Sequence, residues 1–217
     1  MMLFTPGPAP DIDGIDLRCC SVESLLESLT EAPALIVADP PWSYRNSENG
    51  AAGNHYGTTG TGPIIANLDH AHALAAADAR LVVWATWPTL HDFLPPFLDT
   101  PWRYVTGGCW HKTGAPGIGY HWRGDTEPVL VAVKGRPPKG QHSNGYASPR
   151  QRHSEKPTDW MIVWLEQWTN PGDLVLDLYA GLAPLARACL ATGRRYIGAE
   201  IDPERHAAAL CLLHKSK

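Results

Sequence analysis

Short apolar runs alternate along the chain with longer segments in which apolar residues recur at helical spacing. Runs such as LIVA at 35–38 and LVVWA at 81–85 are typical of strands buried on both faces of a sheet. We predict strands at 34–38, 80–86, 103–110, 127–134, 173–177 and 195–200, and helices at 64–78, 90–98, 157–168, 183–192 and 203–213. Strands that alternate with helices predict an α/β fold, with a mostly parallel sheet and helices on both faces.

Two of the predicted helices have unusual sequences. Pro95 and Pro96 lie inside the helix at 90–98, and we expect them to shorten or kink it because proline has no backbone N–H. In the helix at 157–168, Trp160, Trp164 and Trp168 recur at helical spacing. That spacing favours packing in the core over an exposed surface for stacking bases.

The segment 135–152 separates the two halves of the chain. It is rich in Gly, Pro, Ser, Lys and Arg, so we predict a long, basic and mobile loop. The 217 residues suit one domain, divided into 34–134, this loop, and 153–217.

Composition limits the class of protein. No apolar stretch approaches the roughly 18 residues of a membrane helix, and Met1–Pro10 does not resemble a secretion signal, so we expect a cytoplasmic protein. The five cysteines include no C-x-x-C pair, which favours reduced, mostly buried thiols over disulfides. No H-x-x-x-H pair occurs among the ten histidines, and we expect no metal site.

Charge is distributed unevenly along this acidic chain, whose formal net charge is −4. Between residues 134 and 156 only Glu155 is acidic, and the bases are Lys134, Arg136, Lys139, Arg150, Arg152 and Lys156. Such a segment can neutralise nucleic-acid phosphates locally, because screening confines its field to about 10 Å. A loop kept soluble by its charges is the alternative interpretation.

The first candidate site is Asp39-Pro40-Pro41-Trp42, which ends a predicted strand. Ligands of open parallel sheets bind at the carboxyl ends of the strands. An exocyclic base amine is a poor nucleophile, because its lone pair is delocalised into the ring. The carboxylate of Asp39 and the carbonyl of Pro40 could each accept one of its N–H groups and favour the transition state. A simple Asp-Pro-Pro turn is the alternative.

The second candidate site lies far away in the sequence, at the turn DLYAG formed by 177–181. It follows an apolar strand and precedes a helix, and its small residues let a ligand approach the backbone. Glu200 ends the next strand, where an acid can bind the ribose hydroxyls of an adenosine. No phosphate-binding G-x-x-x-x-G-K motif is present, which favours a nucleoside without a triphosphate.

Together these motifs resemble a permuted amino-methyltransferase, with the catalytic strand first and the cofactor strand last. HSEKP at 153–157, PGDLVLDLYAG at 171–181 and GRRYIGAEID at 193–202 are similar to the C-terminal half of bacterial N4/N6 DNA amino-methyltransferases. ADPPWSYRN, HYGT, LVVWATWPTL and GYHWRGDTEPVLVAVKGRPP resemble the MT-A seventy family, which includes the catalytic subunit of the mRNA N6-adenosine methyltransferase.

This resemblance implies a single Rossmann-like methyltransferase domain that uses S-adenosylmethionine. Its catalytic residues would be Asp39, Pro40, Pro41 and Trp42, and its cofactor contacts would come from Asp177, Tyr179, Ala180, Gly181, Glu200, Ser154 and Lys156. Within that set, Lys156 would pair with the methionine carboxylate and Glu200 with the ribose. Leu182-Ala183-Pro184 departs from the more glycine-rich cofactor loop of the family.

Candidate substrate contacts lie on aromatic and basic residues near these motifs. A base could stack on Trp42 or Tyr44, and the Gly- and Asn-rich segment 46–62 could close over it as a lid. Further candidates are His55, Tyr56, Trp122, Arg150 and Arg152. The target base would have to be flipped out or already single-stranded.

The expected function is methylation of adenine N6 in nucleic acid, with DNA favoured over RNA by the bacterial-type C-terminal half. Methylation of cytosine N4 is an alternative, because the same chemistry serves both amines. A non-catalytic nucleic-acid-binding subunit is a different class of alternative. We expect no membrane partner. The sequence allows either a homodimer or a complex with a partner subunit.

Overall fold

The computed structural model describes residues 12–43, 59–114, 121–149 and 155–216. Its elements in chain order are β1 (Ile15–Cys19), α1 (Val22–Glu27), β2 (Leu35–Ala38), α2 (Thr61–Leu74), β3 (Ala79–Trp84), α3 (Trp87–Leu98), β4 (Arg103–Thr113), β5 (Thr126–Lys134), β6 (Gly145–Pro149), α4 (Thr158–Trp168), β7 (Leu174–Asp177), α5 (Pro184–Thr192), β8 (Arg195–Glu200) and α6 (Pro203–His214). No helix in these ranges is long and apolar enough to cross a membrane.

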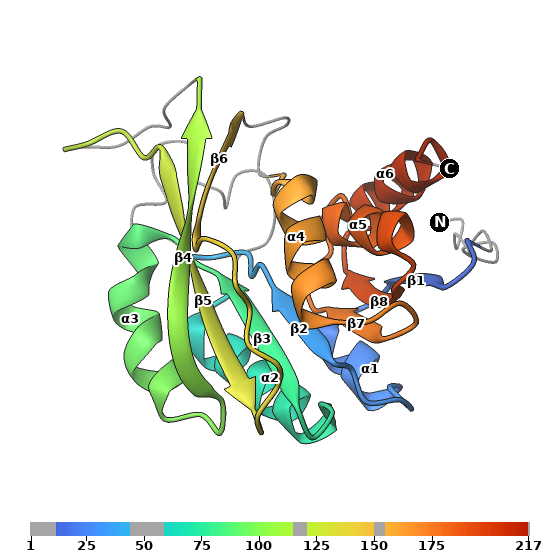
Figure 1. The fold of residues 1–217 in the computed structure, drawn as a ribbon, viewed down its shortest axis with the longest axis horizontal. Coiled ribbons are helices and arrows are strands. Elements are labelled where there is room, and N and C mark those ends of the chain that lie inside the picture. The colour runs from blue at the N-terminus through green and yellow to red at the C-terminus, as the bar shows by residue number, and fades with distance from the viewer. Residues whose placement is uncertain (1–11, 44–58, 115–120, 150–154, 217) are drawn as a thin grey trace, which may run out of the picture.

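The described strands form one eight-stranded sheet in the order β1-β8-β7-β2-β3-β5-β4-β6 (Figure 1). Neighbouring strands from β1 to β3 are parallel, and β6 is parallel to β4. Only β5 runs antiparallel to its neighbours β3 and β4 in the described sheet. The carboxyl ends of the parallel strands and the start of β5 therefore meet at one edge.

Helices cover both faces of this sheet, which confirms the predicted α/β fold. Apolar residues of α1, α2 and α3 pack with one face of the central strands. Those of α4, α5 and α6 pack with the other face, in a cluster that includes Trp160 and Trp164. Trp160 and Trp164 are thus core residues as their spacing predicts, with 4% and 3% exposed, whereas Trp168 is partly buried against the cluster.

The two ends of the sheet differ most from the sequence prediction. Strand β1 and helix α1 were not predicted, and part of the predicted loop 135–152 is strand β6. This strand forms because Tyr146 stacks on Trp160 with ring centroids 5.5 Å apart. In addition, the indole N–H of Trp110 donates to Ser148 Oγ over 3.0 Å.

Two smaller expectations also need correction. Helix α3 is not shortened by its prolines: it runs from Trp87 to Leu98, because Phe93 and Phe97 are fully buried and hold its last turns against the core. Only Cys189 of the five cysteines is buried, whereas Cys19 and Cys211 are exposed.

The turn after β5 depends on Gly135. Its φ is +63°, and an added Cβ would lie 2.1 Å from the carbonyl oxygen of Ala77. We expect Gly135→Ala to lower the free energy of unfolding by about 2 kcal/mol or more, because strain and a backbone clash add. Urea unfolding measures this loss. Gly124→Ala is the control, because Gly124 has open space at its Cβ and no positive φ; equal losses in both variants would contradict the expectation.

Candidate active site

The carboxyl ends of β2, β7 and β8 surround a cavity of about 450 Å³. In the sheet, Val37 lies opposite Asp177, and Asp177 lies opposite Gly198. The strand ends of both chain halves therefore meet, although they lie far apart in the sequence. The residues that line the cavity include every member of the two predicted motifs, together with Glu200: Asp39, Pro40, Pro41, Trp42, Asp177, Leu178, Tyr179, Ala180, Gly181 and Glu200.

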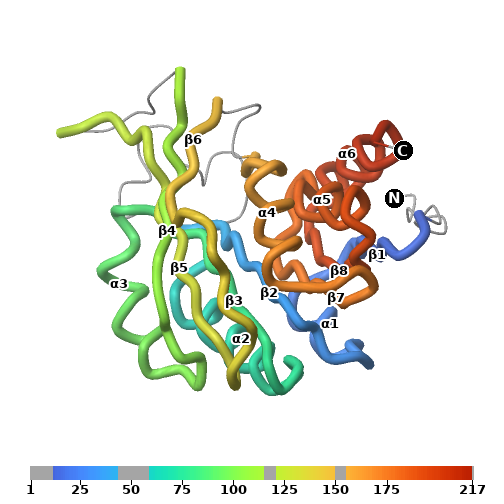
Figure 2. The backbone as a smooth tube through the Cα atoms, in the orientation of Figure 1, coloured from blue at the N-terminus to red at the C-terminus, as the bar shows by residue number. Residues whose placement is uncertain are grey.

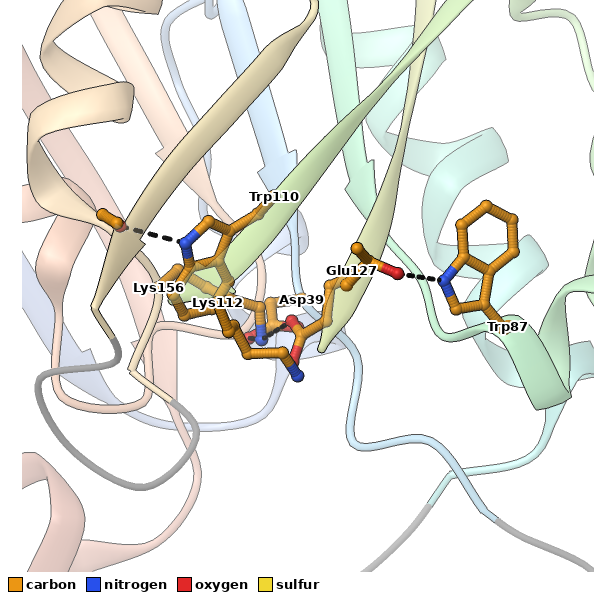
Figure 3. Close-up of polar contacts among 8 residues, drawn as sticks. Asp39, Trp87, Trp110, Lys112, Glu127 and Lys156 are labelled. Carbon is orange, nitrogen blue, oxygen red and sulfur yellow. Dashed lines mark hydrogen bonds and ion pairs between the residues drawn. The ribbon is translucent and has the colours of Figure 1, made fainter. Parts of the chain in front are cut away.

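Four charged side chains form an alternating row at this cavity (Figure 3). The ammonium of Lys156 lies 2.7 Å from Asp39 Oδ2 and 3.4 Å from Glu127 Oε2. The ammonium of Lys112 lies 2.9 Å from the other oxygen of Glu127. Lys156 was expected to bind the cofactor, but its ammonium is engaged by two carboxylates because β5 brings Glu127 to the same edge.

Burial and charge oppose each other within this row. Burial raises the pKa of Asp39, and Lys156 only partly offsets it, so this pKa lies above its usual range. Burial also raises the pKa of Glu127, but Lys156 and Lys112 more than offset it, so that pKa lies below its usual range. Burial lowers the pKa of Lys156, but its two carboxylate partners raise it by more. The pKa of Lys156 therefore lies above its usual range, and the ammonium is retained. The side chain of Asp39 remains 30% exposed, so the carboxylate is reachable from the cavity.

Pro40 and Pro41 differ in how their carbonyl groups are used. The carbonyl of Pro41 accepts a hydrogen bond of 2.8 Å from the backbone N–H of Thr59. Among the described residues, no backbone N–H donates to the carbonyl of Pro40. The carbonyl of Pro40 thus differs from that of Pro41, since no described backbone group would compete with a ligand for it.

Trp42 is packed in the core, contrary to the expectation that a base could stack on it. It is 6% exposed, and its indole N–H donates to the carbonyl oxygen of Trp84 over 3.2 Å. Its ring meets Phe93 edge-on with centroids 5.0 Å apart. Trp42 therefore contributes a wall to the cavity and fixes the turn that carries Asp39.

Asp177 is an almost fully buried acid on the opposite wall, with 4% exposed. It accepts hydrogen bonds from the hydroxyl of Tyr196 over 3.1 Å and from the backbone N–H of Tyr179 over 3.3 Å. Burial nevertheless raises its pKa to about 7. The Tyr196 side chain passes over Gly198, where an added Cβ would lie 2.2 Å from the hydroxyl. The glycine is therefore required for this hydrogen bond.

The turn between β7 and α5 is tight despite its departure from the glycine-rich pattern. Gly181 has a φ of +55°, and Ala183 adopts the left-handed conformation with a φ of 53° before Pro184 starts α5. Arg187 holds this turn, donating to the carbonyl of Leu182 over 3.0 Å and pairing with Glu155. An added Cβ at Gly181 would have no other atom within 4 Å, so the space beside this backbone is open.

Glu200 is held in place at the end of β8. It is 8% exposed, and its Oε1 accepts a hydrogen bond of 2.9 Å from the backbone N–H of Asp202. Asp202 in turn caps α6 by accepting from the N–H groups of Glu204 and Arg205. The carboxylate of Glu200 is thus fixed at the cavity wall.

Several predicted contacts do not join this site. Trp122 is described and 91% exposed, and it does not line the cavity. The other candidates lie outside the described residues: Tyr44, His55, Tyr56, Arg150, Arg152 and Ser154.

Sequence reasoning missed Glu127, Lys112, Asn67 and Glu23. Asn67 donates to the hydroxyl of Tyr179 over 3.4 Å and to Glu23 Oε1 over 3.0 Å, so α1 and α2 help to position Tyr179. The available signal for Glu127 was an acid beside Pro128 at a predicted strand start. Among the residues described, no group of three acids, histidines or cysteines could hold a metal ion.

Comparisons with known proteins agree on one class. A family model described as DNA methylase, for N6 and N4 methyltransferases, matches residues 83–210. The Escherichia coli (strain K12) protein named "Putative methylase YubD" is 29% identical over 140 residues, which span 60% of this chain and 60% of that protein. The chain thus spans less than two thirds of that relative.

Solved structures of methyltransferases share the fold. The M1.HpyAVI–SAM complex has a TM-score of 0.71 and 18% identity, and the match covers 92% of this chain and 99% of that one. The cytosine-N4-specific PvuII DNA methyltransferase has a TM-score of 0.73 and 14% identity, with 94% and 93% covered.

The raised pKa of Asp177 predicts a pH dependence of stability. Its pKa is about 7 in the folded protein against an ordinary 3.8. Between these values the folded state binds a proton that the unfolded state has released. The free energy of unfolding therefore decreases as pH rises from about 4 to about 7, by up to about 1.4 kcal/mol per pH unit from this group. Urea unfolding across that range should show a flatter profile for Asp177→Asn; identical profiles would contradict the assignment.

Proposed function

Because this chain belongs to the DNA methylase family of N6 and N4 methyltransferases, we propose that it methylates adenine N6 in DNA with S-adenosylmethionine as methyl donor. The observation that carries this proposal is the meeting of Asp39 and the carbonyl of Pro40 with the Asp177 turn and Glu200 at one cavity. Asp39 and the carbonyl of Pro40 are two hydrogen-bond acceptors for the N–H groups of an amine whose nitrogen gains positive charge during attack. The opposite wall, formed by the Asp177 turn and Glu200, suits the nucleoside part of the cofactor.

The cavity fits S-adenosylmethionine in size and in charge. Its volume of about 450 Å³ lies within the range of small-molecule sites. Glu200 would accept hydrogen bonds from the ribose hydroxyls, and the unobstructed backbone at Gly181 would allow close approach. The carboxylates of Asp39 and Asp177 favour a cationic ligand. When bound, the cofactor supplies an electrophilic methyl group on a sulfonium.

Asp39 and Pro40 would orient the target amine for in-line attack. Oδ2 of Asp39 is already paired with Lys156, which leaves Oδ1 for one N–H of the amine. The carbonyl of Pro40 would accept the other. Both acceptors become more favourable as the nitrogen gains positive charge, so their effect is larger in the transition state than in the ground state.

Glu127 would keep Lys156 from neutralising Asp39 completely. The single ammonium is shared between two carboxylates, and Lys112 supports Glu127 from the other side. A shared ammonium holds Asp39 in place and still leaves negative charge on it for the amine. Glu127 and Lys156 are therefore positioning residues for Asp39.

Cytosine N4 is the second candidate target. The similarity in fold to the cytosine-N4-specific PvuII enzyme supports it, and the acceptor pair suits either amine. Adenine is favoured by the DPPW motif and its resemblance to N6-adenosine methyltransferases. RNA remains a candidate substrate on the same resemblance, and the family match favours DNA.

Asp39→Ala tests the proposed catalysis. We expect methyl transfer to fall by at least about 10²-fold, because an acceptor for the developing charge is lost, while cofactor binding by calorimetry persists. The protein is incubated with S-adenosylmethionine and unmethylated DNA or RNA, which is then digested to nucleosides for mass spectrometry. Asp13→Ala, an exposed acid at the opposite edge of the sheet, is the matched control.

The product identifies the base. N6-methyladenine that disappears in Asp39→Ala supports the full proposal, and N4-methylcytosine would retain the chemistry but replace the target. Cofactor binding without any methylated nucleoside would instead favour a non-catalytic subunit or a missing partner. Full activity of Asp39→Ala would overturn the role of the carboxylate.

Glu127→Gln tests the positioning row. We expect kcat to fall by roughly tenfold with little change in KM, because Lys156 then neutralises Asp39 more fully. The acidic limb of the pH–rate profile should move to lower pH, since the negative charge of Glu127 raises the pKa of Asp39. Glu166→Gln on the exposed side of α4 is the control. A lower rate with an unmoved pH profile would indicate a merely structural role.

A further inference from the structure

A second cavity, of about 880 Å³, lies along β4 and β5 and beside α4. It shares no lining residue with the cavity that holds Asp39. Its lining residue Arg80 lies near the start of β3, whereas Asp39 lies beyond the carboxyl ends of the strands. The second cavity therefore extends toward the opposite end of the strands. The cavity is therefore a separate feature of the fold.

The segment 136–144 runs as a strap between β5 and β6 (Figure 2). Its residues Arg136, Pro137, Lys139, Gly140 and 142–144 line this cavity. At one end the backbone N–H of Arg136 donates to Asp78 Oδ1 over 2.6 Å. At the other end the N–H groups of Gln141 and His142 donate to Gln167 Oε1 over 2.9 and 3.1 Å. Gly140 fits against Trp168, since an added Cβ would lie 2.5 Å from the indole nitrogen. The strap is thus fixed at both ends.

The charge on the cavity wall has one sign. Arg80, Arg103, Arg136 and Lys139 line it, and no carboxylate does so among the described residues. The whole chain has a net charge of −4, so this concentration of positive charge is local. A concave wall of this kind attracts an anion.

Arg80 is the strongest sign of a missing ligand. The residue is 5% exposed, and the one hydrogen bond from its guanidinium to a described residue is a long contact of 3.5 Å to the carbonyl oxygen of Trp168. Its guanidinium rests 5.2 Å from the centre of the Trp168 ring, and it has no carboxylate partner among the residues described. Burial lowers its pKa to about 10. A buried guanidinium without an anion is costly, and a bound anion would remove that cost.

The remaining walls suit a planar apolar group. Val129, Val131 and Val133 of β5 present one side, and Trp160 and Trp164 present another. The volume exceeds what a lone phosphate needs and falls within the range of sites for organic ligands. Arginine forks match phosphate oxygens in geometry and charge.

We propose that this second cavity binds a nucleoside phosphate, with the phosphate on Arg80, Arg136 and Lys139 and the base against the Val129–Val133 wall. The nucleoside phosphate is either a free nucleotide or one residue of a nucleic-acid strand. The site does not depend on the methyl-transfer reaction, because it uses other residues and needs no methyl donor.

Calorimetry of the full chain at low salt tests the proposal, with dATP as the probe and deoxyadenosine and inorganic phosphate as separate comparison ligands. We expect dATP to bind, and each comparison ligand to bind at least roughly tenfold more weakly, since each lacks half of the recognised chemistry. A short single-stranded oligonucleotide is then titrated as a competitor. Competition identifies a strand as the source of the phosphate, and its absence identifies a free nucleotide.

Variants of the wall assign the binding to this cavity. Arg80→Met should raise the Kd for dATP by at least roughly tenfold, and Lys139→Gln by several-fold because Lys139 is exposed. Lys215→Gln, which removes an exposed lysine on the last turn of the chain, is the matched control for Lys139→Gln. If Arg80→Met does not fold, Arg136→Gln on the strap replaces it.

Two results would overturn the proposal: no binding of dATP up to about 10 mM, a weak limit for a specific site, or binding that the wall variants leave unchanged. S-adenosylmethionine binding is measured on the same samples. Absence of S-adenosylmethionine binding by the unsubstituted chain, with dATP binding intact, would overturn the methyltransferase proposal alone. S-adenosylmethionine binding without dATP binding would overturn this proposal alone.

Discussion

The parallel pairing of β2 with β7 is the constraint on which the rest of the molecule depends. These strands come from opposite ends of the chain, and their register places Val37 opposite Asp177. Because both strands run in the same direction, the turns that follow them open at the same edge. The Asp39 turn and the Asp177 turn become two walls of one cavity only through this pairing. Any register shift by one residue would turn Asp177 to the other face of the sheet.

The acids gathered at this edge explain the unusual electrostatics of the site. Asp39 and Glu200 are close enough to Asp177 to raise its pKa, on top of the larger effect of its burial. Lys156 and Lys112 compensate the carboxylates on the β5 side, and no described cation forms an ion pair with Asp177. The Asp177 side of the cavity would therefore gain most from a cationic ligand, as the proposed function requires.

Much of this site could be predicted from the sequence, because its main residues follow apolar strands. Asp39, Asp177 and Glu200 each stand where a buried run ends, and parallel strands bring such ends together. Glu127 could not be found in this way, since it stands at the start of β5 and only the antiparallel direction of β5 brings it to the same edge. Trp42 was misjudged as a surface for stacking because its burial arises from α3, through Phe93, which no local pattern reveals. Strand β6 was missed for a similar reason, since Tyr146 packs on a tryptophan of α4.

The basic segment 134–156 shows why a run of charge in the sequence is not a surface patch. Lys134 donates to the carbonyl groups of His72 and Ala75 and so caps α2. Arg136 and Lys139 line the second cavity, whereas Lys156 is buried beside Asp39. Strand β6 and the strap carry these cations to different places on the sheet, so they cannot act as one phosphate-binding loop. The described cations of this segment that lie together are Arg136 and Lys139, which join Arg80 and Arg103 at the second cavity. Phosphate recognition by the segment is therefore expected there. The described part of the segment thus favours one enclosed phosphate over a long electrostatic track along a strand.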